Sequence, residues 1–138
     1  MFRLVLLASL LAAPLAAQSH TLTVKMTGFK TDQGMAAVAL YDKPDNFPIK
    51  PEKATATLRV PVAKGTAKAE FKNLPPGTYA ISVYHDVNNN NKMDANFIGV
   101  PKEQTGASNN AKGKMGPPAF KDAKFALTGD QTVTITMN

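Results

Sequence analysis

Residues 21–27 read Thr-Leu-Thr-Val-Lys-Met-Thr, and residues 132–137 read Thr-Val-Thr-Ile-Thr-Met. In both stretches polar and apolar side chains alternate at every step. Successive side chains of a β-strand point to opposite faces of its sheet, whereas a helix aligns residues three and four apart. Each stretch therefore predicts a strand with one face for an apolar core and the other for water.

The same alternation recurs along the chain. It appears in residues 36–40, 58–62, 67–72, 79–84 and 124–127. Turn signals rich in Gly and Pro separate these stretches, the strongest of them at Pro75-Pro76-Gly77. No stretch has the spacing of a long amphipathic helix. About seven short strands with such punctuation predict an all-β, antiparallel β-sandwich.

Two connections are longer than the turns of a compact sandwich require. Residues 42–53 hold three prolines, and residues 88–118 are rich in Asn, Gly and Pro apart from an apolar piece at 97–100. Loops of this length in a compact domain are usually functional or disordered. We therefore look for functional residues in these two loops.

The N-terminus has the composition of a secretory signal peptide. Arg3 supplies a positive charge, residues 4–13 form an apolar run, and Pro14 then precedes small residues. The run is too short to span a bilayer, which needs about 20 apolar residues. We predict a signal peptide in residues 1–19, cleaved after Ala17 or Ser19. The mature chain would be one domain, residues 20–138, periplasmic or secreted and without a membrane span.

Composition narrows the class of protein further. The chain has no cysteine, which excludes disulfides and thiolate metal sites. The mature part would carry 15 Lys and Arg against 10 Asp and Glu, a net charge of about +5. Spread lysines are typical of a solvated surface, although they can attract an anionic envelope component. Without tryptophan or an Arg cluster, nucleic acid is not an expected partner, and we expect a monomer.

The sharpest local motif spans residues 86–94. Oxygen-bearing side chains recur there with the spacing of positions 1, 3, 5 and 9 of a calcium loop of EF-hand type, namely Asp86, Asn88, Asn90 and Asp94. Lys92, at position 7, would offer its backbone carbonyl. Position 6 needs an unusual backbone angle and is normally Gly; here it is Asn91, the next most tolerant residue. The motif predicts a calcium site.

Two features predict that this site is weak. Position 12, normally a bidentate Glu, is Phe97. Only two of the candidate side-chain ligands carry charge, so the dissociation constant should fall in the range of about 10⁻⁴–10⁻³ M, unless Glu103 or Asp122 folds in. The alternative is a structural loop whose Asn amides hydrogen-bond to their own backbone as Asx-turns.

Other polar residues offer further alternatives. His85 follows the inward face of the strand at 79–84, where a lone histidine is usually a core or edge group, and its neighbour Asp86 points to the opposite face. Ser108 would be a nucleophile only if His85 reached it. Cleavage after Ser19 would make His20 the N-terminus, and His20 with His85 could then bind copper. Ser108, Asn109 and Asn110 are candidates for a binding loop or a structural wrap.

Several motifs coincide in a fixed order. They are Asn73-Leu74-Pro75-Pro76-Gly77-Thr78-Tyr79-Ala80, His85-Asp86-x-Asn88-x-Asn90, Asp94 with Gly99-Val100-Pro101-x-Glu103, Ser108-Asn109-Asn110, and Gly116-Pro117-Pro118-x-Phe120-x-Asp122-Ala123. Together they resemble the bacterial exported family catalogued as domain of unknown function 2141, over about residues 21–138. That family commonly has Gly where this chain has Asn91. The resemblance implies an exported β-sandwich without an established activity.

The segment from Leu74 to Tyr79 also resembles transthyretin-like and collagen-adhesin B-type modules. There the same phrase joins two strands of an immunoglobulin-like sandwich, and the resemblance implies that fold here. Two functions stay open. One is a non-enzymatic exported module with a weak calcium site; the other is a periplasmic metal-dependent enzyme or metal carrier using His85 with loop carboxylates. An enzyme needs His85 and a carboxylate in one open cleft.

Overall fold

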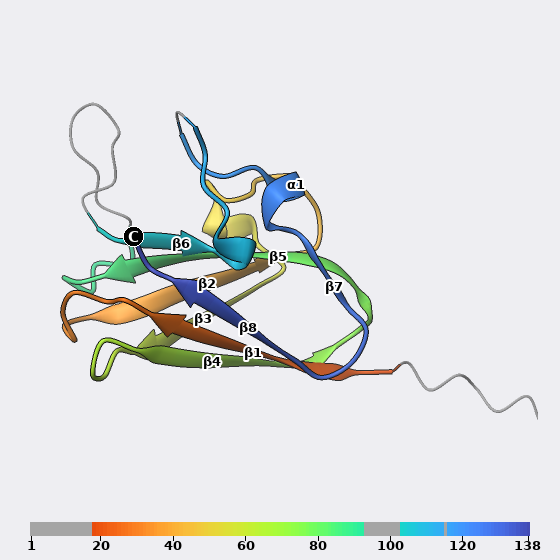
Figure 1. Ribbon diagram of the computed structural model, residues 1–138, viewed down its shortest axis with the longest axis horizontal. Coiled ribbons are helices and arrows are strands. Elements are labelled where there is room, and N and C mark those ends of the chain that lie inside the picture. The colour runs from red at the N-terminus through yellow and green to blue at the C-terminus, as the bar shows by residue number, and fades with distance from the viewer. Residues whose placement is uncertain (1–17, 93–102, 115) are drawn as a thin grey trace, which may run out of the picture.

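The computed structural model of the chain describes residues 18–92, 103–114 and 116–138. Within them, eight strands form two sheets packed face to face (Figure 1). The strands are β1 (His20–Thr27), β2 (Met35–Tyr41), β3 (Ala56–Pro61), β4 (Ala67–Leu74), β5 (Gly77–Asp86), β6 (Thr105–Ala107), β7 (Phe125–Leu127) and β8 (Gln131–Thr136). All seven predicted strands are present, and the all-β sandwich is confirmed.

The first sheet has the strand order β4-β1-β8, and the second has β3-β2-β5-β6, with β7 pairing to the start of β5. Strand β1 runs antiparallel to β4 and parallel to β8. The predicted antiparallel pairing therefore fails at this one pair, because β1 and β8 lie far apart in sequence and no hairpin joins them. Strand β6, of three residues, lies in the predicted long loop and was not anticipated.

The inward faces of the two sheets form the core. Its fully buried members are the alternating apolar residues of the predicted strands, among them Leu22, Val24, Met26, Leu40, Ile81 and Ile135. Because the alternation places these side chains on one face of each strand, burial of that face drives the two sheets together. The same alternation then fixes which residues of β5 point away from the core.

The described parts of the chain between β2 and β3 and between β6 and β7 form a third layer over the outer face of the second sheet (Figure 1). This layer includes the short helices η1 (Pro51–Lys53), η2 (Ser108–Asn110) and α1 (Phe120–Ala123). A second apolar cluster lies beneath it, in which Tyr41 meets Phe47 edge-on at 5.1 Å and Phe47 meets Phe120 at 5.8 Å. This covering explains why β2 is buried on both faces, with small residues at 37 and 39.

The Leu74–Tyr79 segment joins β4 of one sheet to β5 of the other, as expected for a strand connection. The Tyr79 hydroxyl donates a hydrogen bond to the Pro75 carbonyl at 2.7 Å, which fastens the turn to the strand that follows it. A tyrosine with this backward contact also occurs at a corner of immunoglobulin sandwiches. In the described part of the chain, no helix has the length and apolar character needed to cross a bilayer.

Candidate functional site

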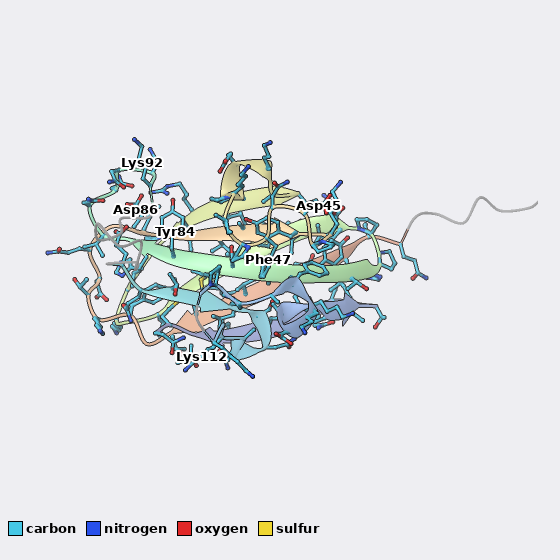
Figure 2. All side chains as sticks on the ribbon, turned by 90° about the horizontal axis from the view of Figure 1, so that it is seen from above. Asp45, Phe47, Tyr84, Asp86, Lys92 and Lys112 are labelled. Atoms are coloured by element: carbon cyan, nitrogen blue, oxygen red, sulfur yellow. The ribbon has the colours of Figure 1, made fainter. Side chains whose placement is uncertain are left out.

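The structure separates the predicted site residues into two groups. His85, Asp86, Asn88, Asn90, Lys92 and Glu103 lie at or beside the end of β5, whereas Ser108, Asn109, Asn110 and Asp122 lie in η2 and α1. Figure 2 shows Asp86 and Lys92 near one end of the molecule. Asp94 and Phe97 fall outside the described residues. The two groups have different chemistry.

Asp86 is the centre of the first group. Its side chain is fully buried, and its Oδ2 accepts hydrogen bonds from Arg59 Nη2 at 2.7 Å and from the Asn91 N–H at 2.8 Å. Its Oδ1 accepts one from the Asn90 N–H at 3.1 Å. Burial raises the pKa of this carboxyl, but the bonds from Arg59 and the two backbone amides outweigh burial and lower it. Asp86 is therefore an ionised, buried carboxylate.

Arg59 reaches Asp86 across a strand. It lies on β3, opposite Ala37 of β2, and Ala37 in turn lies opposite Tyr84 of β5. The side chain at position 37 is only a methyl group, so the guanidinium can extend over the central strand. Its Nη2 also donates to Asn89 Oδ1 at 2.7 Å. Arg59 thus ties the loop after β5 to the edge strand β3.

The loop after β5 turns sharply around the carboxylate. Asn89 and Asn91 have positive φ angles of 54° and 63°, a region that few residues besides Gly and Asn adopt. Asn90 Oδ1 accepts the N–H of Lys92 at 3.0 Å, which forms an Asx-turn. The predicted unusual backbone angle at Asn91 is confirmed. The predicted Asx-turn is confirmed as well. The loop therefore contains one feature expected of a calcium loop and one expected of a structural Asn-rich loop.

Two residues just before β6 support the base of the loop. Glu103 Oε2 accepts the N–H of Val87 at 2.7 Å, one residue after Asp86. Gln104 accepts the His85 N–H through its carbonyl at 2.9 Å, and its side chain bonds to Lys30 and Gly28. Glu103, one of the two carboxylates left open as a further ligand, therefore folds toward the loop, whereas Asp122 belongs to α1.

His85 faces the interior, opposite to Asp86, as the strand alternation predicts. It is fully buried, its ring meets Phe29 edge-on at 4.9 Å, and its Nε2 lies 2.6 Å from the Gln33 carbonyl oxygen. Since that carbonyl only accepts, Nε2 must carry the proton. The other nitrogen, Nδ1, is buried and has no hydrogen-bond partner among the residues that the structure describes. His85 is a core group, and it forms no dyad with its neighbour.

The copper hypothesis is wrong for this fold. His20 begins β1, whereas His85 contacts Phe29 and Gln33, which follow the end of that strand. An eight-residue strand spans about 25 Å at 3.2–3.4 Å per residue. The two histidines therefore lie at opposite ends of the sandwich, far beyond the reach of one metal ion.

The second group is a set of structural contacts. The buried Ser108 Oγ accepts the Ile81 N–H at 2.9 Å and donates to the Ala123 carbonyl at 2.6 Å. Asn109 Nδ2 donates to the carbonyls of Asp122 and Lys124 at 3.2 and 2.9 Å. Asn110 Oδ1 accepts the Thr136 N–H at 2.9 Å. We call Ser108, Asn109 and Asn110 the Ser-Asn-Asn clamp, because they fasten the third layer to β5 and β8.

Sequence reasoning missed the partner that matters most, Arg59. The signal was faint: a single Arg at a polar position of an alternating strand, 27 residues before Asp86. The packing role of Gly34 was missed as well. It has a φ of 71°, and a Cβ added there would lie 2.0 Å from the Asp86 carbonyl oxygen. The β1–β2 connection therefore packs directly on the chain at the start of the loop.

The loop supplies the ligand type that calcium prefers, hard oxygen atoms. Asp86 Oδ1 accepts one hydrogen bond, and an ionised carboxylate has room for about four in all. Within the described ranges, 18–92, 103–114 and 116–138, no group of three or more His, Asp or Glu residues is placed to hold a metal ion. The donor chemistry fits calcium, and any ion here would rely on amide and backbone oxygens or on Asp94.

Comparison with known proteins places the chain in a family. A family described as "Uncharacterized protein conserved in bacteria (DUF2141)" matches residues 24–136, and the chain belongs to it. No curated protein matches the sequence, and no solved structure matches the chain. The predicted family is thus confirmed, while the transthyretin-like and immunoglobulin-like resemblances stay predictions. The family description carries no activity, so the function must be argued from the chain itself.

Proposed function

We propose that the mature chain is an exported, non-enzymatic β-sandwich module that binds one calcium ion weakly in the loop from Asp86 to Asp94. The observation that carries this proposal is the buried Asp86 carboxylate, which organises the backbone of the loop around itself. A calcium loop of EF-hand type takes a ligand from its first position, and a carboxylate held by the backbone of its own loop is pre-organised for that role.

Export rests on the N-terminal sequence. Arg3, the apolar run at 4–13 and the small residues that follow have the order of a secretory leader. The millimolar calcium of extracellular settings suits a site with few charged ligands. The compartment and the weak site are therefore consistent with each other, and the periplasm or the outside of the cell is the proposed location.

The enzyme or metal-carrier alternative needs His85 in an open cleft beside a carboxylate. His85 instead packs on Phe29 and bonds to Gln33, and its neighbour Asp86 turns to the other face of the sheet. These contacts favour a supporting role for His85. They favour the binding module over a site built on this histidine.

Thermal unfolding of the mature chain, residues 20–138, tests the proposal. An ion that binds only the folded state must raise the unfolding midpoint. We expect calcium at about 10 mM, roughly tenfold above the weak end of the expected range, to raise the midpoint relative to chelator. Magnesium, which demands a tighter octahedral site, should raise it less.

Two variants make this test specific. Asp86→Asn should abolish the calcium shift, and Asp122→Asn, which removes an exposed carboxylate on α1, should preserve it. An identical midpoint for the wild-type chain in calcium and in chelator would refute the calcium site. Intact Met1 in protein recovered from outside the cytoplasm would refute the cleaved leader.

A further inference from the structure

We infer that Arg59 sets the calcium affinity of the loop, because it is a resident cation that already shares the Asp86 carboxylate; this rests on the proposed function. The guanidinium lies 2.7 Å from Asp86 Oδ2 and 2.7 Å from Asn89 Oδ1. It therefore contacts the first and fourth residues of the loop at once. Arg59 lies on β3, on the far side of β2 from β5, so a strand other than the one that leads into the loop supplies the cation.

The ion pair between Arg59 and Asp86 is largely shielded from water. The side chain of Asp86 is fully buried and that of Arg59 is 30% exposed. A buried carboxylate loses its hydration, and without a partner its charge is strongly unfavourable. The guanidinium supplies that partner in the absence of any metal. Arg59 thus compensates the charge of Asp86 from within the chain.

The two oxygens of the carboxylate are used unequally. Among the described residues, Oδ2 accepts two hydrogen bonds, including the one from Arg59, whereas Oδ1 accepts one, from the Asn90 N–H. A calcium ion would therefore join at Oδ1, with the guanidinium still at Oδ2. Two cations on one carboxylate repel each other, and the repulsion is strong where water is partly excluded.

Arg59 consequently has two opposite effects. It stabilises the loop when calcium is absent, and it weakens calcium binding by repulsion. This differs from a merely structural role, in which loss of Arg59 would lower both stability and affinity. The sign of the affinity change therefore separates the two roles.

Calcium titration of the mature chain by calorimetry at low ionic strength, with thermal unfolding in chelator, tests the inference. Arg59→Gln removes the charge and leaves a shorter, neutral polar side chain. Arg59→Lys keeps the charge and serves as the matched control. We expect Arg59→Gln to lower the midpoint in chelator and to bind calcium at least about tenfold more tightly than wild type, as expected when a nearby like charge is removed. Arg59→Lys should bind like wild type.

Each result separates the inference from the proposed function. If wild type binds calcium and Arg59→Gln binds no more tightly, Arg59 is structural only and the inference is wrong while the proposed function holds. If only Arg59→Gln binds, the inference holds and wild type has no working site. If none of the three chains binds, both are wrong. If Arg59→Gln is unfolded in chelator, a calcium titration followed by circular dichroism gives the result: refolding at calcium concentrations below those that saturate wild type supports the inference, and refolding only at higher concentrations, or none, contradicts it.

Discussion

Two Asn-rich segments look alike in the sequence and have opposite construction. The loop at 86–92 is built around a charge: one buried carboxylate gathers a guanidinium and two backbone amides. The Ser-Asn-Asn clamp contains no charge, and each of its side chains bonds to a backbone group of another element. In the loop, one carboxylate holds the backbone of its own segment and pairs with a charged side chain of β3, whereas in the clamp uncharged side chains bond to the backbone of other elements.

The comparison shows why composition alone cannot separate a binding loop from a structural one. Asn serves both, since it tolerates positive φ and its amide can donate and accept. Positive φ angles occur in both segments, at Asn89 and Asn91 in the loop and at Asn109 and Asn110 in the clamp. What differs is the identity of the partners. Stability and its pH dependence should therefore differ between the two segments.

The largest effect should come from the residue packed under the loop, Gly34. Its added Cβ would lie 2.0 Å from the Asp86 carbonyl oxygen, a contact with backbone that cannot move aside, and its φ is positive. We expect Gly34→Ala to lower the free energy of unfolding by about 4 kcal/mol or more, at the upper end of single substitutions. Gly129→Ala, with nothing within 4 Å of its added Cβ, is the control for chemical denaturation. Equal stability of the two variants would contradict the close packing.

The stabilisation that the ionised Asp86 gives the fold should be lost in acid. Because the folded-state pKa of Asp86 lies below its ordinary value of 3.8, the carboxylate stabilises the fold at pH values above about 4. That stabilisation is lost as the pH falls through the lower folded-state pKa. We expect Asp86→Asn to cost about 3 kcal/mol at neutral pH, since it leaves Arg59 without its anion.

The measurement is urea unfolding of both chains between pH 7 and about pH 2.5. The stability difference between wild type and Asp86→Asn should be constant down to about pH 4 and then shrink. A difference that stays constant to the lowest pH would mean that the charge of Asp86 contributes nothing, and the contrast between loop and clamp would fail.

The fold was predictable because alternation is a local signal. Every long strand shows it, and the opposite orientation of His85 and Asp86 follows from the same rule. Strand β6 carries no such signal, since three residues that include a Gly are too few to alternate. The pairing of Arg59 with Asp86 depends on the register of β3 and β5 on either side of β2. Register is set by the tertiary structure. Sequence analysis could therefore identify the carboxylate, Asp86, but not the cation that pairs with it, Arg59.

Removal of a clamp side chain should lower the stability of the fold by a smaller amount, and this loss should not depend on pH. Ser108→Ala leaves the buried Ile81 N–H and the Ala123 carbonyl without their shared partner. We expect a loss of about 2 kcal/mol, the usual cost of leaving buried polar groups unpaired. A hydroxyl does not titrate in acid, so the loss should be the same at pH 7 and pH 3 in urea unfolding. A loss that disappears in acid would place Ser108 in the charged network instead.

The smallest effects give the sharpest comparison, because Asn91 and Asn109 share nearly the same backbone angle, with φ of 63° and 58°. Within the described residues, Asn91 contributes its N–H to Asp86, whereas Asn109 contributes two side-chain donations. Glycine keeps the N–H and adopts positive φ without strain, but it brings no side chain. Asn91→Gly should therefore change stability by less than about 0.5 kcal/mol, and Asn109→Gly should cost about 1 kcal/mol.

Urea unfolding of the two glycine variants side by side measures this difference, and Asn109→Ala completes the set. Alanine loses the same donations and also strains the positive φ, so it should cost about 1 kcal/mol more than glycine at position 109. Equal losses for Asn91→Gly and Asn109→Gly would mean that Asn is used for its backbone tolerance in both segments. A larger loss for Asn109→Gly would mean that only the clamp requires the side-chain amide. Position 91 would then accept glycine, which is the residue that a calcium loop prefers at its sixth position.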